Sequence, residues 1–252
     1  MYIIIRTMLA GIFRDVHTLV WTILFPIAML LGLGLYFHDI EYSERLLSGV
    51  LTTNVLFGAA MVTAFYVMSH RNRGIYKLLR VTPFSTAAFI GATTVARTVL
   101  TLLVSCSVIL ISVLVLGVKL TVPGLLMMLT TLLIGTVCFT AIGFIAANLS
   151  KDESNVNMIS NLISFPMLLT SEAFYSLQNA PEWVRVIGRL LPFHYFVKSM
   201  EIAIQQPFDI TNLMPLVILI VFTALCLAAA VFTFRWDTEG SVFRLRKNGL
   251  SS

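Results

Sequence analysis

The residues that could carry chemistry in this sequence form two patterns, a polar stripe and a basic segment, and neither pattern is typical of catalysis. The sequence contains no HExxH, GxSxG or CxxC motif, so it lacks these common arrangements for zinc-dependent, serine-dependent and redox catalysis. It also contains no Walker A motif, GxxxxGK[ST]. We therefore predict that the chain is not an enzyme by itself and binds no metal or other cofactor.

The polar stripe lies between residues 157 and 175, where small polar side chains recur in steps of three and four, as on one face of a helix. Such a face either packs against another helix through hydrogen bonds or lines a polar pathway, and both interpretations stay open. A charged residue follows near the predicted external end of this span. The candidate pathway-lining residues are Asn157, Asn161, Ser164, Ser171 and Glu172.

The basic segment, residues 71–80, is the most positively charged part of the chain, and Pro83 follows its predicted helix as a stop signal. It combines a basic face with an apolar ridge. From the residues alone it is either a charged loop that sets membrane topology or a cytoplasmic helix that docks a partner protein. Its candidate coupling residues are Arg71, Arg73, Ile75, Tyr76, Lys77, Leu78, Leu79 and Arg80.

The composition determines the environment in which these patterns lie. Of the 252 residues, 58% are hydrophobic and 12% are charged, and the mean hydropathy is +0.92. A soluble domain has about 25% charged residues, so the sequence excludes a soluble globule and a disordered chain. The three cysteines show no disulfide or metal-ligand spacing. The net charge of +5 has no basic–aromatic pattern typical of nucleic-acid binding, so we predict no nucleic-acid partner.

Long uncharged runs predict an all-α integral membrane protein with six transmembrane helices. A span needs roughly 20 apolar residues to cross the hydrocarbon core. A transmembrane barrel is excluded because it would show alternating segments of about ten residues. The predicted spans cover about 19–37, 46–69, 86–118, 123–147, 155–177 and 211–234, in a single transmembrane domain over 1–252.

Two further segments are amphipathic at helical spacing. Residues 2–18 predict an interfacial helix before the first span, although a simple extension of that span is the alternative. Residues 180–206 predict two short external helices between the last two spans, separated by Pro192. In the fourth span, small residues at steps of four or eight predict close helix packing; they are Thr131, Gly135, Gly143 and Ala147.

The distribution of basic residues predicts the orientation in the membrane. With a cytoplasmic amino terminus, the inside segments hold twelve Lys and Arg residues and the outside segments hold five. An even number of spans then places both termini in the cytoplasm. Two charges fall inside predicted spans, Arg97 and Glu172, and for both a functional and a structural role remain open.

These elements and several short motifs together resemble the membrane subunits of type-2 ABC exporters, which move drugs, lipids, polysaccharides and peptides. Residues 71–74 (RNRG) and 78–83 (LLRVTP) look like the family's basic-glycine segment and its Thr-Pro stop. Residues 180–183 (APEW) and 191–195 (LPFHY) look like its external elements. The resemblance covers nearly the whole chain, but residues 171–174 (SEAF) stand where many members have a small-residue Ser-Gly pair.

The resemblance implies a coupling role for residues 71–80 and a separate ABC ATPase subunit, present in two copies, that holds the ATP and Mg²⁺. It also implies a second permease subunit, identical or homologous, and a multi-pass location in the cell membrane with the lipid bilayer as surroundings. The expected function is an exporter pathway for an amphipathic drug, lipid, peptide or glycan. The alternatives are an ion-coupled carrier or channel, and a non-transporting immunity or sensor subunit.

Overall fold

The computed structural model describes residues 16–37, 40–74, 86–175, 177, 180–204 and 212–234, and every regular element in these ranges is a helix. The prediction of an all-α protein is therefore confirmed for this part of the chain. The elements are α2 (Val16–Phe37), α3 (Ile40–Val55), the π-helix η1 (Leu56–Met61), α4 (Val62–Asn72), α6 (Thr86–Val115), α7 (Val122–Leu149), α8 (Glu153–Leu169), α9 (Glu182–Arg189), α10 (Pro192–Ile204) and α11 (Met214–Thr233).

Within the described ranges, four helical runs are long and apolar enough to cross a membrane. They are Tyr42–Asn72, Ala88–Val115, Val122–Leu149 and Met214–Thr233, and the first of them is the continuous run of α3, η1 and α4. The described apolar part of α2, Thr22–Phe37, is shorter, and α8 has 17 residues. The predicted count of six spans therefore stays a prediction.

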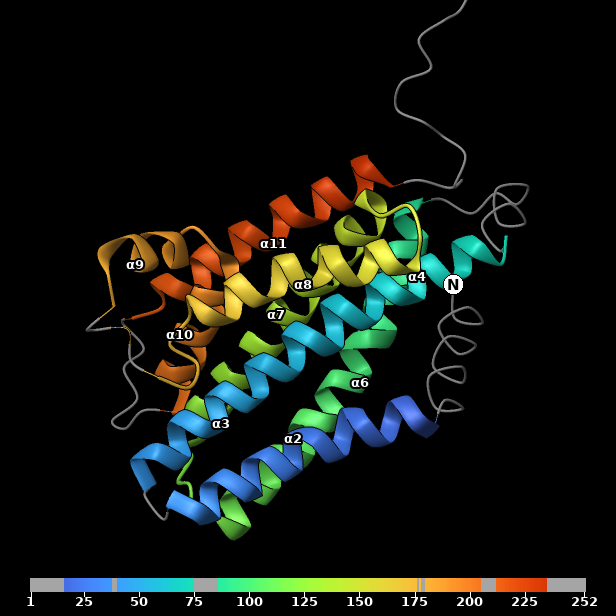
Figure 1. Cartoon of the computed structure of the whole chain (residues 1–252). Coiled ribbons are helices and arrows are strands. Elements are labelled where there is room, and N and C mark those ends of the chain that lie inside the picture. Colours follow the sequence, from blue (N-terminus) through green and yellow to red (C-terminus); the bar gives the residue numbers. More distant parts are fainter. Residues whose placement is uncertain are drawn as a thin grey trace, which may run out of the picture.

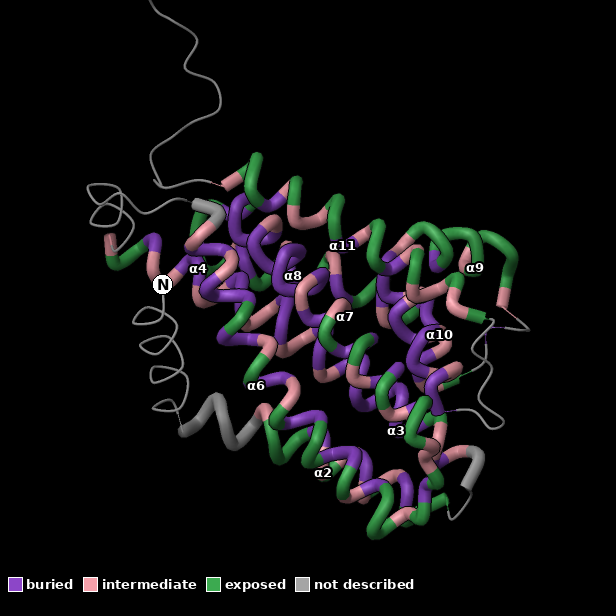
Figure 2. The backbone as a smooth tube through the Cα atoms, turned by 180° about the vertical axis from the view of Figure 1, so that it is seen from behind, coloured by how far each residue is buried: buried purple, intermediate pink, exposed green. Residues whose placement is uncertain are grey.

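The long helices lie side by side, and their ends gather at two opposite ends of the bundle (Figure 1). The short helices α9 and α10 lie at one end, and the end of α4 lies at the other (Figure 1). Helix α7 runs through the centre, where it packs against α11, α10, α6, α4 and η1. It is buried along much of its length, whereas α2 and α11 present exposed residues to the outside (Figure 2).

Small residues allow neighbouring helices to approach α7 closely. A β-carbon on Gly143 would overlap the carbonyl oxygen of Ala60 in η1, and one on Gly135 would overlap the ring of Phe196 in α10. Thr131 and Ala147 are also fully buried. The close packing predicted for this face is confirmed, and it explains why α7 occupies the centre of the bundle.

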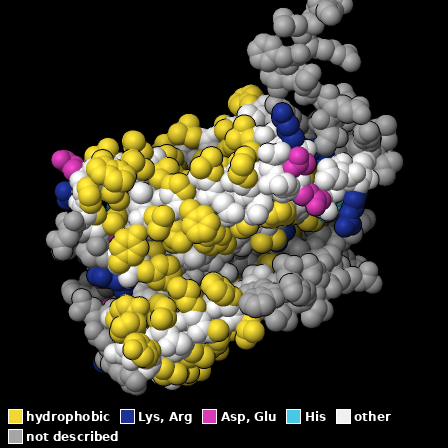
Figure 3. Space-filling view, in the orientation of Figure 1, with side chains coloured by type: hydrophobic (Ala, Val, Ile, Leu, Met, Phe, Trp, Pro, Cys, Tyr) yellow, Lys and Arg dark blue, Asp and Glu magenta, His cyan; other side chains and the backbone are white. Residues whose placement is uncertain are grey.

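Hydrophobic side chains cover the broad middle of the face in Figure 3, and the charged side chains on that face gather toward the two ends of the helices. Large apolar residues such as Leu114, Leu162 and Phe232 are exposed. A band of this kind would aggregate in water, but it matches the hydrocarbon interior of a bilayer. The distribution is that of a multi-pass membrane protein.

Several predicted boundaries differ from the observed ones. The span predicted to reach residue 177 ends as a helix at Leu169. The backbone N of Thr170 still donates to the carbonyl of Pro166 (2.9 Å), but the backbone N of Ser171 donates three residues back, to the carbonyl of Leu168 (3.3 Å), so the last turn tightens and the helical pattern stops. Helices α9 and α10 fall inside the range 180–206. The predicted interfacial helix lies outside the described residues except for Val16 and the two residues after it, which belong to α2, and segment 75–80 also lies outside them.

Candidate functional site

An apolar cavity of about 670 Å³ lies where α2, the α3–η1–α4 run and α8 meet. Aromatic and aliphatic side chains form most of its wall, and Asn54, Thr53 and Thr22 add a few polar groups. A mostly apolar cavity with a few polar groups is typical of sites for small amphipathic molecules. The lining residues are Thr22, Phe25, Pro26, Met29, Val50, Thr53, Asn54, Phe57, Gly58, Met61, Val62, Phe165, Leu168 and Phe174.

The π-helix η1 provides one wall of this cavity, with Phe57, Gly58 and Met61. A π-turn contains an additional residue, and such turns are frequent at functional sites. A β-carbon on Gly58 would meet no atom nearer than Asn54 Oδ1, at 3.9 Å, so the glycine leaves this wall open. This wall was not predicted from the sequence, where Asn54 inside a long apolar run was the available signal.

A second, shallower groove of about 740 Å³ lies between α8 and α9. Asn161, Phe165 and Leu169 of α8 form one side, and Trp183 and Ile187 of α9 form the other. Phe165 also lines the cavity, so this one residue borders both spaces. Exposed apolar residues, including Leu162 and Leu169, continue along this face of α8.

The residues of the predicted polar stripe divide between two environments. Asn161 faces the groove, and its Nδ2 donates a hydrogen bond to Oδ1 of Asn157 (3.0 Å), which is exposed. Ser164 and Ser171 are buried inside the chain. The stripe is not continuous because α8 ends before Ser171, and a pathway role for its members stays a prediction.

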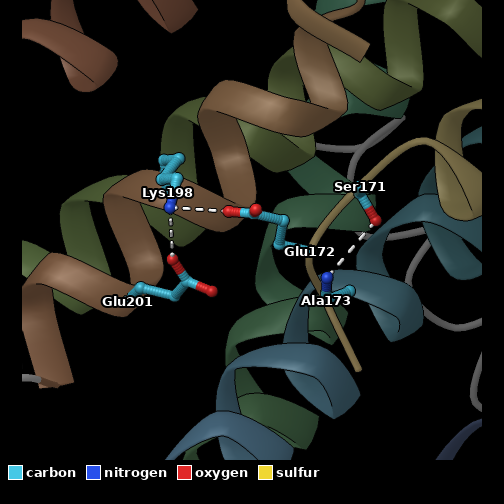
Figure 4. Close-up of polar contacts among 5 residues, drawn as sticks. All are labelled: Ser171, Glu172, Ala173, Lys198 and Glu201. Carbon is cyan, nitrogen blue, oxygen red and sulfur yellow. Dashed lines mark hydrogen bonds and ion pairs between the residues drawn. The ribbon is translucent and has the colours of Figure 1, made fainter. Parts of the chain in front are cut away.

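Glu172, the last candidate of this group, belongs to a charged cluster at the α9–α10 end of the bundle (Figure 4). Lys198 of α10 lies between two carboxylates, 2.7 Å from Oε2 of Glu172 and 3.2 Å from Oε2 of Glu201. The contact with Glu172 connects α10 to the segment that comes directly after α8. Glu172 is therefore an ion-pair partner in this structure.

The two carboxylates have opposite pKa shifts, and both lie outside the helices that can span a membrane. Burial raises the pKa of Glu172, but the hydrogen bond from Lys198 and its positive charge lower the pKa by a larger amount. The pKa of Glu172 therefore lies below the ordinary value. For Glu201, burial dominates and the pKa is raised despite the proximity of Lys198. The pKa of Lys198 is raised, because the two carboxylates outweigh its burial.

At the opposite end of the bundle, Arg71 and Asn72 connect the end of α4 to the α7–α8 turn. Arg71 is 5% exposed, and its Nη1 donates a hydrogen bond to the carbonyl of Ala147 (3.1 Å). The side-chain Nδ2 of Asn72 donates to Oε1 of Glu153 at the start of α8 (3.2 Å). Of the other candidate coupling residues, Arg73 is exposed, and the rest lie in segment 75–80, outside the described residues.

The buried Arg97 of α6 lies near this end of the bundle. Its guanidinium carbon is 5.6 Å from the centre of the Tyr66 ring in α4, and Tyr66 in turn contacts His70. Stacking a cation on an aromatic face reduces the cost of burying it. This contact joins α4 to α6.

The apolar band and the long helices define a multi-pass membrane protein. A comparison with family models identifies it further: residues 1–204 match the model described as ABC-2 type transporter, and the chain belongs to this family. The resemblance noted in the sequence is thus confirmed, and the chain is the membrane subunit of a type-2 ABC transporter. A comparison with curated proteins gives no match.

Proposed function

We propose that this chain is the membrane-spanning subunit of an ATP-driven exporter and forms the translocation pathway for an amphipathic substrate. The observation that supports this most directly is the apolar cavity beside η1, because it provides a space for cargo within the family's membrane domain. Drugs, lipids, peptides and glycans with an apolar part are the cargo classes that fit. Hydrolysis of ATP belongs to a separate ATPase subunit, in two copies.

The pathway is completed by a second permease subunit, identical or homologous. The groove between α8 and α9 leaves Leu162, Phe165 and Trp183 exposed, so another apolar helix could cover them. Across such an interface, Asn157 and Asn161 would face the partner's helices, where polar side chains provide hydrogen bonds that hold subunits together or contact passing cargo.

The end of the bundle that carries Arg71 and Arg73 faces the cytoplasm in this proposal, and segment 71–80 docks on the ATPase. The count of twelve basic residues inside and five outside supports this orientation, as does the apolar ridge of the segment. Both termini then lie in the cytoplasm, and α9 and α10 lie on the outer side of the cell membrane.

The proposal is tested by purifying the chain from its native host and reconstituting the purified material in proteoliposomes. We expect an ATPase with a Walker A motif to co-purify, and we expect release or uptake of a fluorescent amphipathic dye to require ATP. The chain alone should hydrolyse no ATP. Transport that follows an ion gradient without ATP would indicate a carrier or channel, and an ATPase unaffected by removal of this chain would indicate an immunity or sensor subunit.

A further inference from the structure

Arg71 belongs to the most basic segment of the chain, but its side chain lies in the protein interior. It is the penultimate residue of α4, and its side chain is buried rather than exposed to solvent or headgroups. Its Nη1 donates to the carbonyls of Ala147 (3.1 Å) and Ser150 (3.5 Å), and its Nη2 donates to Oδ1 of Asn148 (3.1 Å). All three acceptors lie at the end of α7, more than seventy residues away in the sequence.

These contacts join four helix ends. Asn148, which accepts from Arg71, donates through Nδ2 to Oγ1 of Thr233 at the end of α11 (3.3 Å). Asn72, the neighbour of Arg71, reaches Glu153 in the first turn of α8. The end of α4 is therefore bonded to α7 directly, to α11 through Asn148, and to α8 through Asn72.

The chemistry of this junction requires an arginine. The last carbonyls of a helix have no partner within the helix, and the planar guanidinium presents several donors in a fixed geometry that reaches more than one of them. A lysine ammonium at the same place would keep the charge but would not reproduce this fixed fork. The chain leaves the junction at Gly74, whose φ of +69° ends the helical path.

We propose that Arg71 is a positioning residue for energy coupling. It holds the end of α4, from which the chain continues toward the ATPase, in a fixed relation to the ends of α7 and α8, so that displacement of one is passed to the others. This inference rests on the proposed function, in which this end of the bundle faces the ATPase. The contacted helices include α8, which lines both the cavity and the groove, and α7, the centre of the bundle.

The test uses the complete permease–ATPase complex in proteoliposomes and measures cargo transported per ATP hydrolysed. For Arg71→Met we expect the complex to assemble and hydrolyse ATP while the transported cargo per ATP falls about tenfold, the size of effect that residues of a coupling network have. Arg71→Lys should recover only part of the ratio. A merely structural cap would lower the amount of folded complex and leave this ratio unchanged, and that result would overturn the inference.

Lys151→Met is the matched control, because it removes one positive charge from an exposed position in the α7–α8 turn, at the same end of the bundle, and should leave the ratio at the wild-type value. If Arg71→Met yields too little folded complex, the same measurement is made on Asn148→Leu and Arg71→Lys. An unchanged amount of cargo transported per ATP in both variants would overturn the inference. A wild-type complex that lacks an ATPase or transports without ATP would contradict the proposed function instead. The two failures are thus distinguishable.

Discussion

Gly143 of α7 lies directly against the carbonyl oxygen of Ala60 in η1, with no room between them for a β-carbon. The π-helix that forms one wall of the cavity is thus supported from behind by the central helix of the bundle. The Cβ of Thr63, one turn further, would also lie only 3.0 Å from a β-carbon on Gly143. The backbone cannot move aside as a flexible side chain could, so this contact fixes the position of η1 relative to α7.

Gly143→Ala should therefore destabilise the protein, because the added methyl group forces α7 and η1 apart. Overpacking of this kind costs about 1–3 kcal/mol, which should appear as a lower thermal unfolding temperature in detergent. Gly32→Ala in α2 is the control, since nothing lies within 4 Å of a β-carbon at that position. It should be neutral or slightly stabilising, and equal losses for both variants would contradict the packing argument.

Gly58→Leu tests the cavity as a pathway. Its side chain would extend into open space, because only Asn54 Oδ1 lies within 4 Å of a β-carbon there. We expect the variant to fold normally and to hydrolyse ATP in the complex, while transport of an amphipathic dye falls by about tenfold or more, equivalent to roughly 1.4 kcal/mol of lost cargo binding. Gly32→Leu adds the same side chain at an exposed position on α2 and should transport normally.

The sequence allowed the helices to be predicted because their signals are local. Long apolar runs, the position of Pro192 between the two external helices and the small residues of α7 act within one or two helical turns, and they predicted the helical class and the close packing of α7. The cavity depends on how three separate helices meet around η1, and no local pattern states which turn of a long apolar helix becomes a π-helix. The polar stripe was predicted to continue along one helical face to Ser171, but α8 ends at Leu169, before that residue.

The contacts of the charged residues could not be predicted from the sequence either, because they too depend on how distant helices pack together. Glu172 and Lys198 are 26 positions apart, and only the return of α10 onto the end of α8 brings them to 2.7 Å. Arg71 likewise reads as one member of a basic segment, whereas its burial depends on α7, which ends far along the chain. A basic residue that accompanies several others gives no sequence signal for an individual structural contact.

Glu172→Gln and Glu201→Gln should have unequal effects at neutral pH. The lowered pKa of Glu172 means that its ionised form stabilises the fold above the ordinary carboxyl pKa of about 4.3, and this contribution is lost as the pH falls through the lower folded value. The raised pKa of Glu201 means that its charge is unfavourable in the folded state above its pKa, a cost that acidification relieves.

We therefore expect Glu172→Gln to lower thermal stability at pH 7 by up to about 1 kcal/mol, because the ion pair is partly exposed, and Glu201→Gln to be neutral or stabilising. The loss caused by Glu172→Gln should shrink when the pH is lowered below 4. Unfolding temperatures measured across this range check both signs. A larger loss for Glu201→Gln than for Glu172→Gln at pH 7 would contradict the assignment of Glu172 as the main partner of Lys198.

Asn161→Leu and Ser164→Leu separate the two environments of the polar stripe. Asn161 lines the open groove, so leucine should be accommodated, and transport or cargo-stimulated ATP hydrolysis should change more than folding does. Ser164 is 1% exposed, and a leucine there should overpack the interior at a cost of about 1–3 kcal/mol. Yield and unfolding temperature, measured beside transport, distinguish the two. Poor folding of Asn161→Leu would show that this residue serves packing only.

Leu79→Asp, with every basic residue retained, tests whether segment 71–80 docks on the ATPase. Membrane insertion depends on the number of Lys and Arg residues and is indifferent to the apolar residues between them. Docking needs the apolar ridge, because burial of a leucine side chain against a partner is worth about 1.5–3 kcal/mol. We expect the variant to insert normally but to lose the ATPase during purification, or to keep it without transport, whereas Leu79→Met should behave as wild type. Leu78→Asp should repeat the effect. If both aspartate variants reach the membrane, retain the ATPase and transport at the wild-type rate, segment 71–80 acts only as a topology signal.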